Sequence, residues 1–170
     1  MGSGRSDYKI IRVSPTLDTN AYAEDDVLFT ATEITDAVIG LGGCSKLVAM
    51  YMIDKSQTDS DIDFYFSEGN TALGTINATA NITDANLVSN NICGVARLDA
   101  NTATVGDGLD NARIFQVMPL SGTAEDSNPT MLLQAASDSN SVFVQGILTS
   151  ATTPTYANGD IQLILHLELR

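Results

Sequence analysis

The chain has 170 residues and a mass of 18.0 kDa, which is the size of one domain. Hydrophobic residues make up 44% of the chain, enough to fill one core, and 21 acidic against 8 basic residues give a formal net charge of -13. This balance excludes general nucleic-acid binding and argues against adhesion to anionic lipid, because too few bases are present to neutralise phosphates. No apolar stretch approaches the roughly 18 residues of a membrane-spanning helix.

Apolar and polar residues alternate with a period of two along most of the chain, which predicts strands. The predicted strands are 8–13, 27–32, 46–54, 61–66, 92–97, 113–118, 130–135, 141–148 and 161–169. The alternation also predicts a core that includes Ile62, Phe64, Phe66, Val142, Val144, Leu163, Leu165 and Leu167. Nine short strands separated by Gly, Asn, Asp and Pro predict an all-β fold, an antiparallel β-sandwich with a jelly roll as one form of it.

Helix signals are scarce, and we expect at most one short helix. Thr83 followed by Asp84 is typical of a helix N-terminus and predicts a turn or two over 83–88. Residues 47–53 are apolar on both faces, as expected for a strand that is covered on both sides. We divide the chain into an N-terminal arm, 1–17, and a single sandwich domain, 18–170.

The sequence predicts neither an enzyme nor a cofactor-binding protein. The single histidine, His166, lies between Leu165 and Leu167 in a predicted strand, so no proton acceptor is available for a catalytic triad. The run 59–63 resembles the start of a calcium loop, but its closing ligands are missing, and the alternation places Asp61 and Asp63 on a solvent-facing side. We therefore expect no metal site.

The two cysteines, Cys44 and Cys93, have small or apolar neighbours, which favours inert thiols in the core. Whether the two pair in a disulfide stays open at this point.

The charges are unevenly distributed. The first twelve residues hold three bases against Asp7 alone, whereas the remainder is strongly acidic. This asymmetry predicts that the arm docks on a partner, with the bases guiding approach and apolar residues adding as a strand to a neighbour's sheet edge. The candidate partner-binding residues are Arg5, Lys9, Ile10, Ile11, Arg12 and Val13. The alternative is that 8–13 pairs within its own sheet.

Four segments carry a resemblance to a known family: 18–29, Asp54-Lys55, 61–66 and Pro154-Thr155-Tyr156. With these, the chain resembles small virion proteins of tailed bacteriophages, in particular those of phages that infect marine cyanobacteria. The likeness spans about residues 18–167 and contains no catalytic signature and no site residues that transfer to this sequence.

The resemblance implies a virion protein assembled in the bacterial cytoplasm, most simply a capsid decoration protein of the cement or knob type. Its expected partner is the major capsid protein or another virion protein, and a homo-oligomer, with a trimer as one option, is expected as well. The alternative is a tail- or fibre-associated domain that binds host carbohydrate. Such a domain needs aromatic side chains at loop tips, for which Tyr22 and Tyr156 are the candidates.

Overall fold

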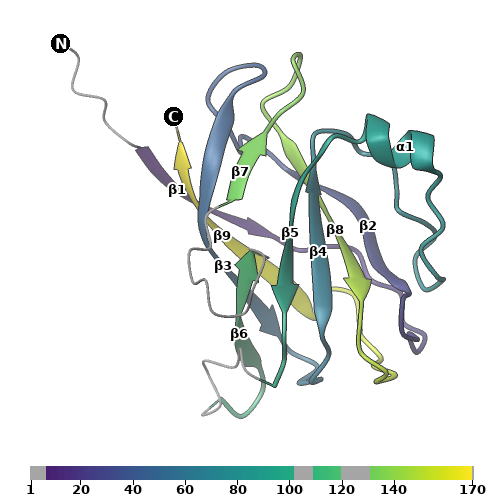
Figure 1. Ribbon diagram of the computed structural model, residues 1–170. Coiled ribbons are helices and arrows are strands. Elements are labelled where there is room, and N and C mark those ends of the chain that lie inside the picture. Colours follow the sequence, from purple (N-terminus) through teal and green to yellow (C-terminus); the bar gives the residue numbers. More distant parts are fainter. Residues whose placement is uncertain (1–6, 102–108, 120–130, 170) are drawn as a thin grey trace.

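The computed structural model describes residues 7–101, 109–119 and 131–169, which form nine strands and one short helix (Figure 1). The strands are β1 (Asp7–Val13), β2 (Val27–Ile34), β3 (Cys44–Asp54), β4 (Ile62–Ser67), β5 (Ile92–Leu98), β6 (Arg113–Pro119), β7 (Met131–Gln134), β8 (Val142–Leu148) and β9 (Ile161–Leu169). Each overlaps one of the predicted strands; Thr130, the first residue of the predicted 130–135 strand, lies outside the described residues.

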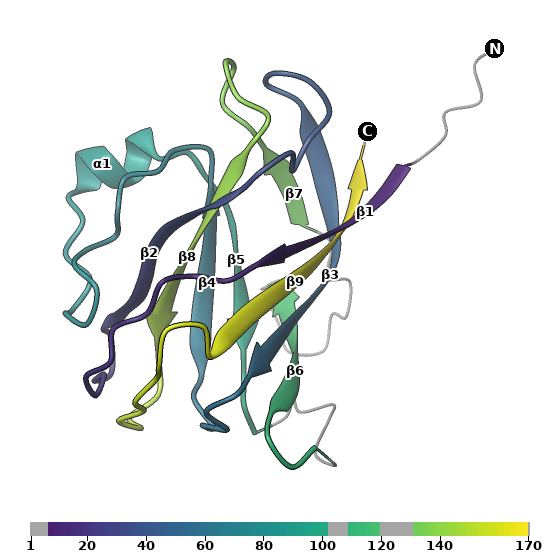
Figure 2. The same ribbon diagram turned by 180° about the vertical axis from the view of Figure 1, so that it is seen from behind.

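The strands form two antiparallel sheets that pack against each other, which confirms the predicted β-sandwich. One sheet has the order β1-β9-β3-β6, with β7 also paired to β3, and the other has the order β5-β4-β8-β2. The chain crosses between the sheets at most connections, and this order is that of a jelly roll with β7 as an added short strand. Figures 1 and 2 show the two layers from opposite sides.

The core lies between the two layers, where alternate residues of both sheets point inward. Phe29 and Phe64 pack with ring centroids 6.2 Å apart. All eight side chains predicted to face the core are fully buried: Ile62, Phe64, Phe66, Val142, Val144, Leu163, Leu165 and Leu167. The alternation therefore assigned the faces of β4, β8 and β9 correctly, because successive side chains of a strand point to opposite sides.

The two long sides of the sandwich differ. On one side, β6 pairs with β3 through 113–117 and then with β5 at Met118 and Pro119, so that it joins the edges of both sheets. On the other side, the edge strands are β1 and β2, and within the described part of the chain neither pairs with a strand beyond its single neighbour. The sandwich is thus closed at β6 and open between β1 and β2 (Figure 2).

The helix α1 (Asp84–Ser89) lies in the connection between β4 and β5. Its N-cap is Thr83, whose side chain accepts a hydrogen bond from the amide of Asn86, as the sequence predicts. No described helix is long and apolar enough to cross a membrane.

Candidate interaction surface

The described residues hold no assembly of catalytic groups around the single histidine. His166 lies on the outward side of β9, where its ring is 5.6 Å from that of Tyr51 on the neighbouring β3. Over the described ranges, no three His, Cys, Asp or Glu side chains come close enough to share a metal ion.

The three aspartates of the run 59–63 have three different partners. Asp59 binds Arg113, Asp61 accepts a hydrogen bond of 2.9 Å from the amide of Ala100, and Asp63 binds Arg97. The expectation that Asp63 faces solvent is wrong, because this residue is only 5% exposed. Asp63 is on the outer face of β4, as the alternation indicates, but Arg97 of β5 covers it from the opposing position.

The two tyrosines considered for carbohydrate stacking are not at exposed loop tips. Tyr22 and Tyr156 are each 1% exposed and contact each other edge to face, with ring centroids 6.0 Å apart. The hydroxyl of Tyr22 donates to the carbonyl of Leu28, and that of Tyr156 lies 2.7 Å from the hydroxyl of Thr58. Both rings stabilise the interior, and neither face is free to stack on a sugar.

The outer face of the β1-β9-β3 sheet is unusually apolar. An antiparallel sheet with one solvated side normally presents polar residues there. Here the outward positions include Tyr8 at 73%, Ile10 at 51% and Leu132 at 66% exposure. Further apolar side chains on this face, exposed or half-buried, are Val48, Tyr51, Ile53, Ile114 and Ile164. We call these eight residues the apolar face; no described segment lies across them.

Strand register makes some members of the apolar face direct neighbours, because Ile164 is opposite Tyr51 and Ile53 is opposite Ile114. Tyr8 is opposite Glu168, which is opposite Lys46, which is opposite Leu132, so one row crosses β1, β9, β3 and β7. Arg12, Ile164 and Tyr51 form a second row across three of the same strands. The Glu168–Lys46 pair thus lies between Tyr8 and Leu132, within a cluster of exposed apolar side chains of the kind that marks an interaction site.

The outer face of the second sheet is different, because part of the β4–β5 connection covers it. The side chain of Gln145, on the outward side of β8, is fully buried. Its amide accepts a hydrogen bond from the backbone of Leu73 and donates one to the carbonyl of Thr71. The apolar residues on both sides of 47–53 predict that both faces of this strand are covered. The described residues cover only the inward face of β3.

The apolar face also differs in charge from the protein as a whole. The described outward positions around it on the same sheet include three charged residues, the bases Arg12 and Lys46 and the acid Glu168. The chain as a whole has a formal net charge of -13. An acidic partner therefore meets less repulsion here than on the remaining surface.

The predicted partner-binding residues divide between two environments. Ile10 and Arg12 point outward; Ile10 is a member of the apolar face, and Arg12 lies next to it, opposite Ile164. Val13 is 7% exposed and belongs to the core, against which Ile11 also packs. Lys9 donates a hydrogen bond of 3.1 Å to the carbonyl of Asp36. Arg5 lies outside the described residues.

Strand β1 is built into the sandwich, since all seven of its residues pair with β9. This is the arrangement that the sequence left as the alternative to a free arm. The members of the apolar face on β3, β7 and β9 were not proposed as site residues from the sequence. The available signal was the second apolar phase of 47–53, which is compatible either with a covering segment of the chain or with a partner.

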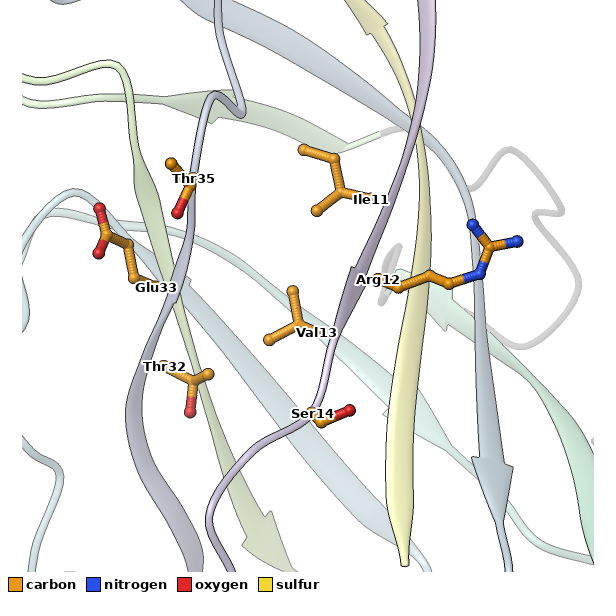
Figure 3. A pocket seen from close by; sticks show the side chains of 7 residues that line it. All are labelled: Ile11, Arg12, Val13, Ser14, Thr32, Glu33 and Thr35. Carbon is orange, nitrogen blue, oxygen red and sulfur yellow. The ribbon is translucent and has the colours of Figure 1, made fainter. Parts of the chain in front are cut away.

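A cleft of about 320 Å³ separates the two edge strands of the open side (Figure 3). Ile11 and Val13 of β1 point into it, and Glu33 lies across from them on β2. Arg12 points away from the cleft, over β9. The edge of β1 that does not pair with β9 borders this cleft. The outward side chains of β1 point away from the cleft.

Both cysteines are free thiols. Cys44 is exposed at the start of β3, so the expectation of a core position is wrong for this residue. Cys93 is half-buried, and burial raises the pKa of its thiol above the ordinary value.

Comparison with protein-family models, with curated proteins and with solved structures finds no match to this chain.

Proposed function

We propose that this protein is a structural component of a bacteriophage virion, a decoration protein that binds the outer surface of the head through the apolar face. Its partner is the major capsid protein or another virion protein. The observation that carries the proposal is the apolar face itself, a sheet surface that no described segment covers, on an otherwise acidic domain.

The fold supports the proposal without defining it. Jelly-roll sandwiches occur in viral capsid and lectin domains, and a fold by itself does not specify function. Among these two classes, the burial of Tyr22 and Tyr156 favours a protein partner over a carbohydrate, since the candidate stacking rings are in the interior.

The chemistry of the apolar face fits a protein surface. Tyr8, Tyr51 and the aliphatic side chains provide the desolvated area from which most affinity comes, and aromatic residues are frequent anchors in interfaces. Arg12, opposite Ile164, and Lys46, between Glu168 and Leu132, orient an acidic partner and raise the rate of encounter. A non-catalytic role agrees with the isolated position of His166.

Localisation on the particle tests the role. Antibody or gold labelling of intact virions is expected to place the protein on the head, at regular positions of the capsid lattice. Labelling of the tail, or absence from purified particles, would overturn the decoration role.

Occupancy on undecorated heads tests the surface. Leu132→Glu places a charge within the apolar face, and we expect it to lower occupancy at least tenfold. The matched control is Leu41→Glu in the β2–β3 connection, where the side chain is 72% exposed, similar to Leu132. Equal occupancy of the two folded variants would show that another surface binds the particle.

A further inference from the structure

The outermost strand of the apolar face has a free edge. β1 pairs with β9 on one side, and the described residues place no strand on its other side (Figure 2). A flat, exposed edge with apolar side chains is a template for pairing with another strand, unless charges or bulges block it. β1 is in continuous register with β9 over its seven residues and has no bulge.

We propose that two copies of this chain associate edge to edge through β1, with the two β1 strands antiparallel about a twofold axis at Ile10. This inference concerns self-association and does not depend on the role in the virion.

The register follows from the sequence of β1, Asp7-Tyr8-Lys9-Ile10-Ile11-Arg12-Val13. Centring the pair on Ile10 is the one register that aligns all seven residues of both strands. It sets Ile10 against Ile10 of the second copy and Tyr8 against Arg12 of the second copy, all on the outward side. A guanidinium over a tyrosine ring and an aliphatic pair are both favourable cross-strand neighbours.

The adjacent registers are less favourable. A shift of the axis to Lys9 sets two ammonium groups against each other and leaves only five aligned residues. A shift to Ile11 also aligns five residues and sets Tyr8 against Ser14, which has no complementary group. Like charges directly opposite each other destabilise a pair of strands, so the sequence selects the Ile10-centred register.

Charge in β1 does not block this pairing. Each copy has a formal net charge of -13, whereas β1 carries Lys9 and Arg12 against Asp7, so the contact strands carry little net charge compared with the acidic bodies. The Ile10-centred register sets Arg12 against Tyr8 and Lys9 against Ile11, so no two bases are directly opposed. Lys9 reaches the carbonyl of Asp36 on the inner side, so the outward pairs at 8, 10 and 12 are not obstructed by its side chain.

Association in this way joins the two β1-β9-β3 sheets into one. The apolar faces of both copies then become a single continuous surface. The dimer would present twice the contact area to a particle partner, and neither copy would have to rearrange.

The oligomeric state of charge variants is the first test. In sedimentation velocity over a wide concentration range, we expect the wild-type chain to form a dimer, and Ile10→Lys to remain monomeric because two ammonium groups meet at the axis. The control is Leu132→Lys, a residue of the apolar face that lies away from the edge and is 66% exposed against 51% for Ile10, and this variant should still dimerise. A wild-type monomer at all concentrations overturns the proposal, as does equal loss in both variants.

Directed disulfides test the register in a background in which Cys44 and Cys93 are both serine. Directly opposed residues of antiparallel strands have Cα atoms about 4.5–5.5 Å apart, within the range of a disulfide. Ile10→Cys should therefore cross-link with itself on mild oxidation. Tyr8→Cys should not, because the two copies of that residue lie about 13 Å apart along the strands.

A mixture of Tyr8→Cys protein with Arg12→Cys protein should give the cross-linked heterodimer, because these residues are opposed only in the Ile10-centred register. Cross-linking of Tyr8→Cys with itself, or none in the mixture, would contradict the proposed pairing. Particle occupancy of Ile10→Lys, measured in parallel, separates this interface from the docking role.

Discussion

Arg97 on β5 lies directly opposite Asp63 on β4 and donates two hydrogen bonds of 2.7 Å to its carboxylate, one from Nε and one from Nη2. The Asp63 side chain is 8% exposed and that of Arg97 is 48% exposed. Hydrogen bonding to Asp63 also raises the pKa of the guanidinium above its ordinary value. Arg97 thus shields the carboxylate of Asp63 from water.

We predict that Arg97→Ala destabilises the protein by about 1–3 kcal/mol, because it leaves a nearly buried carboxylate without its donors. Arg97→Lys should recover only part of this, since an ammonium cannot form the paired contact. Urea unfolding measures both. The double variant with Asp63→Ala should lose less than the sum of the single losses, and strict additivity would argue against coupling.

Phe64 is fully buried between the sheets and contacts Phe29. We predict that Phe64→Ala lowers the free energy of unfolding by about 3–5 kcal/mol through lost burial and a residual cavity. Leu132→Ala, on the exposed side of its strand, should change it by no more than about 0.5 kcal/mol. Similar losses for the two variants would contradict the assigned faces.

Gly146 on β8 is paired with Phe29 on one side and Phe64 on the other. A Cβ atom at this position would lie 2.5 Å from the Phe29 ring, which has no room to retreat in a filled core. We predict that Gly146→Ala costs about 1–3 kcal/mol. The combination with Phe29→Leu should relieve part of this cost in thermal unfolding, and no relief would show that another contact is responsible.

Burial raises the pKa of Tyr22 to about 12, from an ordinary value near 10, and also raises that of Tyr156. The fold therefore favours the neutral phenols. Between about pH 10 and pH 12 the unfolded chain loses these protons first, so stability is intact below pH 10 and falls as pH rises through this interval. In urea titrations, Tyr22→Phe should show a shallower alkaline loss than wild type. An identical slope would contradict the assignment.

Asp59, Asp61 and Asp63 each have a different partner, so we predict that calcium does not stabilise the protein. Chelation and millimolar calcium should both leave the thermal unfolding midpoint unchanged. A calcium-dependent rise that disappears in Asp61→Asn would refute this.

The candidate surface shows where reasoning from the sequence ends. Alternation identifies Tyr8, Ile10, Val48 and Ile164 as apolar residues opposite the core-facing phase, but it cannot tell a cover within the chain from a surface. Only the path of the remaining chain decides this, and the described covering segment lies on the other sheet, over Gln145.

The sequence by itself determined the class of fold, the approximate strands and the buried side of β4, β8 and β9. These depend on a period of two and on turn residues, which act within a few positions of the chain. It also determined the helix α1, through the cap at Thr83.

The tertiary structure alone decided which strands are neighbours. Asp7 pairs with Leu169, almost the full length of the chain away, and such contacts follow from the closure of the whole sandwich and not from local preference. The same closure put Arg97 over Asp63 and placed Tyr22 and Tyr156 in the interior. It also left one edge of β1 without a neighbouring strand among the described residues. Burial is a property of three-dimensional neighbours, so no local pattern contains it.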